Sequence, residues 1–490
     1  MKLVILAPSQ EYQSSAGARI RYGRVAPRIA AAGISLSIED IAQFDPANDE
    51  CDVLIVSKCY DARALVAAET MARRGARVGV DLFDDYFSDH SDSRLVRLRL
   101  WLRQLLGICD FAMCSTPALA EVISGYRSQL PVHVLDDPAP DIDYGQLART
   151  LAQKLCAAHA ERRIRLCWFG MGDNPYFEVG LSDLAAFAGM IAQLSSGDMA
   201  VELSILTNAR ALDARRLGMV ASLPVPATVE EWSEAREVEV LRDSLACFLP
   251  VNAQSFSAAK SLNRAITAMA AGCQVLSAGY PLYSRLEPFI YRDAENFLGD
   301  LRLGGMRLSA DRFEEFRARI DAEASPEGVA SALATFLLGL GDKKPLPPTP
   351  LYLIHGFGTT AAAHKMVQTL GGLSICTPFC TAGLDFDVIF EVRTGREVAM
   401  LVSDSVRQHL RSEYGVRALR RQIGKRRFWE LASIASSENP TSGWTGMSLP
   451  LQLALYPSIM RAVSERLDDS FGPGKHILSE VSPWPFEANA

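Results

Sequence analysis

Long apolar runs and a surplus of positive charge are both missing from this chain of 490 residues. No stretch approaches the ~20 uninterrupted apolar residues of a membrane-spanning helix. The opening MKLVILAPSQ reaches a proline after about five apolar residues, too few for a signal-peptide core. Asp and Glu number 57 against 50 Lys and Arg, a net charge of −7, which argues against a general nucleic-acid binder. We expect a cytoplasmic protein whose phosphate-binding sites are local.

Paired cysteine motifs are also missing. The ten cysteines include no C-x-x-C pair, and several lie in or beside apolar, strand-like runs. Such thiols are typically buried and reduced. Cys376 and Cys380 are the closest late pair, but no further Cys or His stands near them, so a zinc site is a poor interpretation. We therefore expect neither a metal ion nor a resident cofactor.

Two common nucleotide-binding signatures are absent. Neither KLVILAPSQ (2–10) nor RLCWFGMGD (165–173) continues into G-x-G-x-x-G, which argues against a dinucleotide-dependent oxidoreductase. The segment HGFGTTAAAHK (355–365) places glycines after a strand-like run but lacks the order G-x-x-x-x-G-K-[ST] of a phosphate-binding loop. A nucleotide site in this chain must therefore be built in another way.

What the sequence does contain is a strict alternation of strand-like and helix-like segments, which predicts parallel α/β sheets. In the first 150 residues the strand-like segments are KLVILAP, ISLSIED, DVLIVSK, RVGVDLF, FAMCST and VHVLDD. The pattern restarts at Arg163 with RIRLCWFG, VELSILT, ACFLPV and CQVLSA. We predict the fold class α/β, with two tandem Rossmann-like domains at residues 1–155 and 156–340. The second includes trailing helices near 312–322 and 327–340.

The last third of the chain is separated by a proline-rich segment. Residues 341–350, GDKKPLPPTP, contain four prolines and are expected to form an extended linker. Beyond it, LYLIHG, LSICTP, DFDVIFEV and VAMLVSD are strand-like, and a helix is expected at 360–370. We predict a third, small α/β domain at residues 351–490, of unknown role. Its basic segment RALRRQIGKRR (417–427) could contact phospholipid, a polyanionic acceptor, or only water.

One segment of the first domain combines basic and apolar residues. RLVRLRLWLRQLLG (94–107) places Leu95, Leu98, Leu102 and Leu105 on one stripe, with four arginines around it. Such a helix could dock on the anionic inner face of a membrane, as a peripheral contact. The same pattern suits an ordinary helix packed on the first sheet.

The most informative stretch is 244–279, SLACFLPVNAQSFSAAKSLNRAITAMAAGCQVLSAG, with two apolar runs around a predicted helix. We expect this helix to begin near Ser255 or Ser257, to continue over 258–271 and to end at Gly272. Lys260 and Arg264 would then share one face, with Asn263 beside them. A helix N-terminus with two cations suits a diphosphate. The alternative is a surface helix whose Lys and Arg are merely solvated.

Several segments together resemble a family. TAMAAGCQVLSAG (267–279) resembles the strand-entry segment of GT-B glycosyltransferases of the bacterial family 4-like, group 1 type. RLCWFGMGDNPYFEVGLSDL (165–184) is similar to the opening strand and loop of their nucleotide-binding domain, and SSAGARIRYGRVAPRIAAAG (14–33) to their first loop. The resemblance covers roughly residues 1–300. It implies transfer of a sugar from a nucleotide-sugar donor to a saccharide, lipid-linked or protein acceptor, in bacterial surface glycan or glycoprotein synthesis.

Candidate site residues follow from the basic segment and from this resemblance. The residues expected at the donor's diphosphate and nucleotide are Gly17, Arg19, Gly170, Gly172, Ser257, Lys260, Ser261, Asn263 and Arg264. Ser257 and Ser261 could instead cap the helix, and Arg19 and Arg21 could be merely solvated. Asp84 and Asp85 follow a strand that faces the expected cleft, where one could serve as the base of an inverting reaction. Alternatively, they cap a turn.

The sequence departs from the family at two positions. Many retaining members carry two Glu eight residues apart, and here Ala259 and Thr267 stand in those places. The donor sugar and the stereochemistry are therefore left open. The departure also allows a second interpretation, a catalytically degenerate GT-B-like protein that binds a glycan or a partner.

Overall fold

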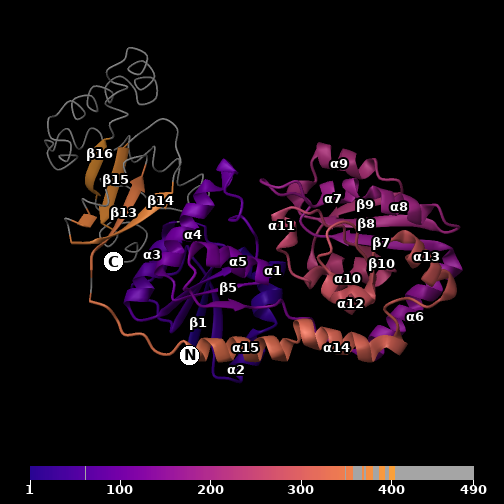
Figure 1. Cartoon of the computed structure of the whole chain (residues 1–490), viewed down its shortest axis with the longest axis horizontal. Helices are drawn as coiled ribbons and strands as arrows, with labels where there is room; N and C mark the ends of the chain where they lie inside the picture. The colour runs from indigo at the N-terminus through magenta and orange to yellow at the C-terminus, as the bar shows by residue number, and fades with distance from the viewer. Residues whose placement is uncertain are drawn as a thin grey trace, which may run out of the picture.

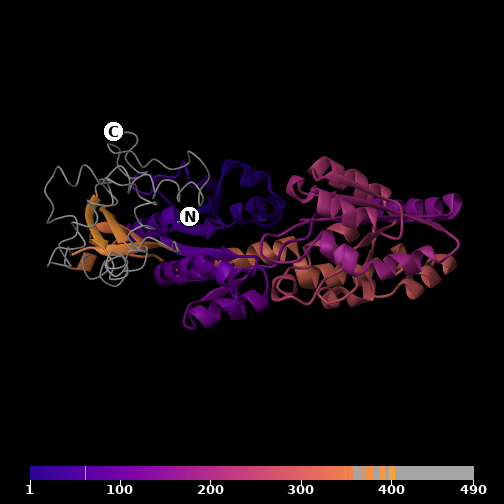
Figure 2. The ribbon, with the colours of Figure 1, turned by 90° about the horizontal axis from the view of Figure 1, so that it is seen from above.

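The computed structural model describes residues 1–60, 62–347, 349–356, 367–368, 371–378, 386–391 and 397–402. Two large α/β domains lie side by side, and a smaller sheet lies beside the first of them (Figure 1). The same side-by-side arrangement is seen from above (Figure 2). None of the helices in this part of the chain is long and apolar enough to cross a membrane.

The first domain is built on a six-stranded sheet of order β2-β1-β3-β4-β5-β6, with every neighbouring pair parallel. Its strands are β1 (Lys2–Ala7), β2 (Ser35–Asp40), β3 (Val53–Ser57), β4 (Arg77–Leu82), β5 (Phe111–Cys114) and β6 (Val132–Val134). Its helices and turns are η1 (Gln10–Ser14), α1 (Ala16–Ala18), η2 (Arg19–Gly23), α2 (Ala26–Ala30), α3 (Ala62–Arg73), η3 (Ser93–Leu95), α4 (Val96–Ile108) and α5 (Pro117–Tyr126). All six strands coincide with the predicted segments.

The second domain repeats this architecture, with a parallel sheet of order β12-β11-β10-β7-β8-β9. Its strands are β7 (Arg163–Phe169), β8 (Ala200–Thr207), β9 (Ala227–Glu231), β10 (Ala246–Phe248), β11 (Gln274–Leu276) and β12 (Ile290–Tyr291). Its helices and turns are α6 (Tyr144–Glu161), α7 (Leu181–Ala186), α8 (Ala188–Ser195), η4 (Ala209–Ala211), α9 (Ala214–Ala221), α10 (Glu234–Asp243), α11 (Ser255–Ala258), α12 (Asn263–Ala270), η5 (Ser284–Phe289), α13 (Ala294–Leu303), η6 (Ala310–Arg312) and α14 (Phe313–Ala324). The prediction of two tandem Rossmann-like domains is confirmed.

The trailing helix α15 (Pro326–Gly339) returns to the first domain (Figure 1). Its buried residues Leu333 and Leu337 belong to the same apolar cluster as Leu3 and Ile5 of β1. The sequence predicts this helix as part of the second domain, which it follows along the chain, and that grouping is corrected here. The chain thus crosses between the domains twice, after β6 and again between α14 and α15.

The helix α4 settles the interpretation of the basic, apolar segment at 94–107. Its apolar stripe is buried in the core of the first domain, with Leu98, Leu102 and Leu105 at most 5% exposed. The buried guanidinium of Arg99 donates to the carbonyl oxygens of Asp89 and Asp92, at 2.5 and 2.9 Å. The stripe packs inside the protein, so it offers no membrane-docking surface.

A third sheet follows the linker, with order β14-β13-β15-β16. Its strands are β13 (Leu351–Gly356), β14 (Leu373–Pro378), β15 (Phe386–Glu391) and β16 (Glu397–Val402). β13 pairs in parallel with β14 and antiparallel with β15. β14 packs against α3 and α4 of the first domain. The helix expected at 360–370, except for residues 367 and 368, and the basic segment 417–427 lie outside the described residues.

Candidate active site between the two domains

Residues from the strand ends of both sheets meet between the two domains. Lys58 follows β3 and Asp84 follows β4 in the first domain, while Lys260 lies beyond β10 in the second. Ligands of parallel α/β sheets bind at the carboxyl ends of the strands. The contact of these three side chains therefore marks the candidate site.

The helix predicted at 258–271 is in fact two helices, α11 and α12. Ala259 ends α11, and the N–H of Lys260 donates to the carbonyl of Ser257 in a tighter turn (3.3 Å). Contacts with the first domain hold this break, because the hydroxyl of Thr116 donates to the carbonyl of Ala259 at 3.0 Å. The expectation that Lys260 and Arg264 share one helix face was therefore wrong. Lys260 lies in the link, and Arg264 lies in the first turn of α12.

Arg264 has a half-buried side chain. Its Nε and Nη2 atoms are buried and have no hydrogen-bond partner among the described residues. The guanidinium carbon lies 5.0 Å from the ring centroid of Trp168 and 5.6 Å from that of Phe169, at the end of β7. Buried N–H groups without a hydrogen-bond partner are costly. The site therefore favours an anion at this point.

The two glycines after β7 have different roles. Gly170 has a φ of +152°, and a Cβ atom there would lie 3.2 Å from the guanidinium carbon of Arg264. A Cβ atom on Gly172 would lie only 2.3 Å from the hydroxyl of Thr207. Gly170 thus lets the backbone pass close to Arg264, whereas Gly172 is required by internal packing.

Asp84 forms an ion pair with a lysine of each domain. Its carboxylate lies 2.9 Å from Nζ of Lys58 and also pairs with Lys260 of the second domain. Burial alone would raise the pKa of Asp84, but Lys260 and Lys58 outweigh it and hold the pKa well below its usual range. Asp84 is therefore ionised at neutral pH. It is also a weak base for as long as both lysines hold it.

Lys58 was missed by the sequence analysis. Its φ of +57° is unusual for a residue with a side chain, and such strain concentrates at functional sites. Its ammonium lies 4.3 Å from the ring centroid of Phe83, next to Asp84. The available signal was its position immediately after the buried strand DVLIVS, at the edge where ligands bind.

Asp85, the other candidate base, is occupied by a local turn. Its carboxylate accepts the N–H groups of Phe87 and Ser88, at 3.1 and 2.9 Å, and the Ser88 hydroxyl. This is the turn-capping alternative considered for the sequence. We therefore leave Asp85 out of the proposed chemistry.

The residues of the predicted first loop are held by protein contacts. Arg19 forms an ion pair with Glu234 of α10, across the two domains. Arg21 is 1% exposed and binds both oxygens of Asp81, at 2.5 and 2.6 Å. A Cβ atom on Gly17 would meet the ring of Phe83 at 3.4 Å, an ordinary contact. Arg21 is thus a structural residue, and the solvated interpretation of it was wrong.

The remaining candidates lie around the break between α11 and α12. The hydroxyl of Ser261 donates to Asp137 of the first domain at 2.6 Å, and Ser257 is buried. The side-chain oxygen of Asn263 accepts the hydroxyl of Thr267 at 3.3 Å. Thr267, at one of the two missing Glu positions, therefore turns its hydroxyl to its own helix. Ala259, at the other, is buried.

An aromatic contact adds to the interface beside the site. The loop after β7 reaches the first domain, where the side-chain amide of Asn174 donates to the hydroxyl of Tyr86 at 3.0 Å. The rings of Phe177 and Phe256 stack with centroids 4.5 Å apart, and Tyr86 lies 5.2 Å from Phe256. No sequence motif indicates this cluster, because its members are far apart along the chain.

The two parallel sheets with their strand ends turned to a common site form the GT-B architecture. No protein-family model and no curated protein matches the chain. Several solved structures are similar to the chain. They include the trehalose-6-phosphate structure from E. coli bound with UDP-2-fluoro glucose, at 11% identity over 70% of this chain and 100% of that chain, with a TM-score of 0.48. Sucrose-phosphate synthase from Thermosynechococcus elongatus is also similar, at 12% identity over 69% of this chain and 99% of that chain, with a TM-score of 0.49. Anabaena Alr3699/HepE in complex with UDP and glucose is similar at 12% identity over 69% of this chain and 100% of that chain, with a TM-score of 0.46. At these identities the likeness concerns the fold.

Proposed function

We propose that the chain is a glycosyltransferase that moves a sugar from a nucleotide-sugar donor to a saccharide, lipid-linked or protein acceptor. The observation that carries the proposal is Arg264, whose buried Nε and Nη2 atoms lack a partner at the carboxyl end of β7. A diphosphate would accept hydrogen bonds from both atoms. Gly170 leaves room for its approach. Synthesis of a surface glycan or glycoprotein is the context that the sequence resemblance implies.

Sugar transfer requires that the negative charge on the departing diphosphate be stabilised. Lys260, in the link between α11 and α12, and Arg264, in the first turn of α12, are the cations suited to this task. In the structure Lys260 is paired with Asp84. We infer that donor binding breaks the ion pair between Lys260 and Asp84, and that Lys260 then binds the diphosphate. The basicity of Asp84 then rises, and its carboxylate becomes able to accept the proton of an acceptor hydroxyl.

Thermal-shift measurements with UDP, GDP, CMP and NAD test the donor site. We expect one nucleoside phosphate to stabilise the chain, and Arg264→Ala to lose at least tenfold in affinity for it. Arg242→Ala, which removes an arginine that is 64% exposed, is the matched control and should bind normally. Stabilisation by NAD alone would overturn the proposal. Hydrolysis assays over a panel of nucleotide sugars then identify the donor.

A glycan- or partner-binding protein without catalysis is the second candidate. It is favoured by Ala259 and Thr267, which leave the usual donor-sugar carboxylates absent. It predicts that no nucleotide sugar in the panel is hydrolysed or transferred, while a glycan still binds. Nucleotide binding that disappears in Arg264→Ala, together with donor turnover, excludes it.

A further inference from the structure

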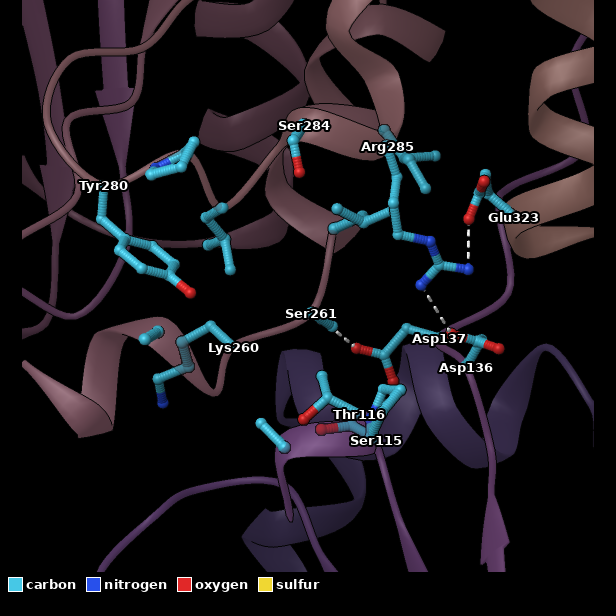
Figure 3. A pocket seen from close by; sticks show the side chains of 17 residues that line it. Ser115, Thr116, Asp136, Asp137, Lys260, Ser261, Tyr280, Ser284, Arg285 and Glu323 are labelled. Carbon is cyan, nitrogen blue, oxygen red and sulfur yellow. Dashed lines mark hydrogen bonds and ion pairs between the residues drawn. The ribbon is translucent and has the colours of Figure 1, made fainter. Parts of the chain in front are cut away.

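A cavity lies on the first domain between α4 and α5, two helices that are labelled in Figure 1. It has a volume of about 290 Å³, at the lower end of the range of small-molecule pockets. Its lining comes from α4, from α5 and from the loop that follows Asp85. The cavity shown in Figure 3 is a different one, since Lys260 and Ser261 of the candidate site line it. No residue proposed to bind the donor belongs to the lining between α4 and α5.

The wall formed by this loop is held in place by side chains of both helices. The hydroxyl of Tyr126, on α5, donates to the carbonyl oxygen of Phe87 at 2.9 Å. From α4, the buried guanidinium of Arg99 donates to the carbonyl oxygens of Asp89 and Asp92, at 2.5 and 2.9 Å. The cavity is thus bounded by hydrogen-bonded backbone, and a ligand would find it largely preformed.

Two side chains of opposite charge line the cavity without touching each other. Arg103 of α4 and Glu121 of α5 are both exposed, and among the described residues neither of them forms an ion pair. Their nitrogen and oxygen atoms therefore lie more than 4.0 Å apart. A guanidinium binds a carboxylate through two parallel hydrogen bonds, and a carboxylate accepts hydrogen bonds from an ammonium group. A molecule that carries both a carboxylate and an ammonium group can therefore meet both charges at once.

The rest of the lining is largely aromatic and aliphatic. Val122 and Tyr126 are half-buried and form the inner part of the cavity. The ring centroid of His90, which is exposed, lies 6.0 Å from that of Tyr126. Burial raises the pKa of Tyr126, so its hydroxyl stays protonated at neutral pH and adds no charge to the cavity. Ring faces beside an aliphatic side chain suit an apolar group of a ligand.

We propose that this cavity binds a free α-amino acid with an apolar side chain. Arg103 binds its carboxylate and Glu121 its ammonium group, while its side chain packs against Val122 and Tyr126. A plain anion would be repelled by Glu121, and a plain cation by Arg103. The site is independent of the proposed transferase function, because it shares no residue with the candidate donor site.

Isothermal titration calorimetry on the full chain tests the site with L-leucine and L-phenylalanine, with their N-acetyl derivatives and with their amides. We expect at least one of the two free amino acids to bind. Its N-acetyl derivative lacks the ammonium group and its amide lacks the carboxylate, so each should bind at least about tenfold more weakly. Equal binding of the N-acetyl derivative or of the amide would mean a site for a plain anion or a plain cation and would overturn the proposal. Absence of binding by both amino acids would also overturn it.

Substitutions test whether the amino acid binds in this cavity. Gly125 lines it, and a Cβ atom there would meet nothing within 4 Å, so Gly125→Phe obstructs the cavity without a backbone clash and should abolish binding. Gly218→Phe, at an exposed helical glycine of α9 with equally open surroundings, is the matched control. Arg103→Gln should weaken binding at least about tenfold, whereas Arg242→Gln, also at an exposed arginine, should not. Binding that survives Gly125→Phe or Arg103→Gln overturns the proposal.

Glu121→Gln tests the ammonium contact by itself. It should weaken binding of the free amino acid and leave the weaker binding of the N-acetyl derivative unchanged, because that derivative has no ammonium group; equal losses for both would overturn the proposal. Thermal shift with the nucleotides on the same variants separates this site from the proposed function, since nucleotide binding should be unchanged in all of them. A chain that binds a nucleotide but neither amino acid refutes this site alone.

Discussion

Replacing Asp84 by Asn removes the carboxylate that joins Lys58 of the first domain to Lys260 of the second. A hydrogen bond between charged groups contributes about 1.5–3 kcal/mol when it is shielded from water. The lysine side chains are 32% and 36% exposed, so solvent screens each pair and lowers its contribution. We therefore expect Asp84→Asn to lower the free energy of unfolding by about 2 kcal/mol.

The pH dependence gives this prediction a sign. The folded-state pKa of Asp84 is held below that of the unfolded chain, so its ionised form stabilises the fold. This contribution is fully present above the unfolded pKa of about 3.9, and it disappears as the pH falls through the lower, folded pKa. The difference in unfolding free energy between wild type and Asp84→Asn should be constant from about pH 5 to 8 and shrink below about pH 4.

Urea unfolding of the two single variants, Asp84→Asn and Lys260→Met, and of the double variant measures the coupling directly. We expect the double variant to be more stable than the sum of the single effects indicates, by about 1 kcal/mol. Additive effects, or an Asp84→Asn variant as stable as the wild type at pH 7, would refute the interdomain ion pair and with it the inferred transfer of Lys260 to the donor.

Three further substitutions test the surroundings of the site. Gly170→Ala should lower the free energy of unfolding by about 2 kcal/mol because the φ of Gly170 is positive, and it should weaken nucleotide binding by displacing Arg264. Gly189→Ala, where the added Cβ atom meets open space, should change neither. Urea unfolding measures the stability of each variant, and thermal shift measures its nucleotide binding. Arg21→Met should cost about 3–5 kcal/mol because it leaves Asp81 buried and unpaired, and Asp81→Asn in the same chain should recover part of this in urea unfolding. Asp85→Ala should cost about 1 kcal/mol and leave donor turnover by the folded protein unchanged.

The sheets could be predicted because their strands are short, apolar and regularly spaced. In the second domain the sequence analysis missed β9 and β12, each for its own reason. The strand β9 lies at the edge of the sheet and ends in the largely polar residues TVEE, and β12 has only two residues. Neither carries the continuous apolar run that marks a buried strand. The return of α15 to the first domain was also beyond sequence reasoning, because its apolar face fits either domain.

The local structure of the candidate site departs from the prediction. Helix propensity predicts one helix for Lys260 and Arg264, while contacts with Thr116 and Asp137 accompany a break in the helix between them. Tertiary contacts override propensity in this way wherever the sequence is locally permissive. Lys58 carries no motif. Its role depends on the adjacency of β3 and β4, which only the fold supplies.

The residues proposed to bind the donor differ in the protein contacts that they would lose on binding it. Lys260 would leave Asp84, Ser261 would leave Asp137, and both of these contacts join the two domains. Arg264 has no such contact to give up at Nε and Nη2 among the described residues. Under the proposed function, a diphosphate would bind Nε and Nη2 of Arg264 without breaking a hydrogen bond of these atoms, and it would bind Lys260 only when the ion pair with Asp84 opens. Donor binding would then be coupled to the interdomain ion pair through Lys260, and Arg264 would contribute to anion affinity independently of that ion pair.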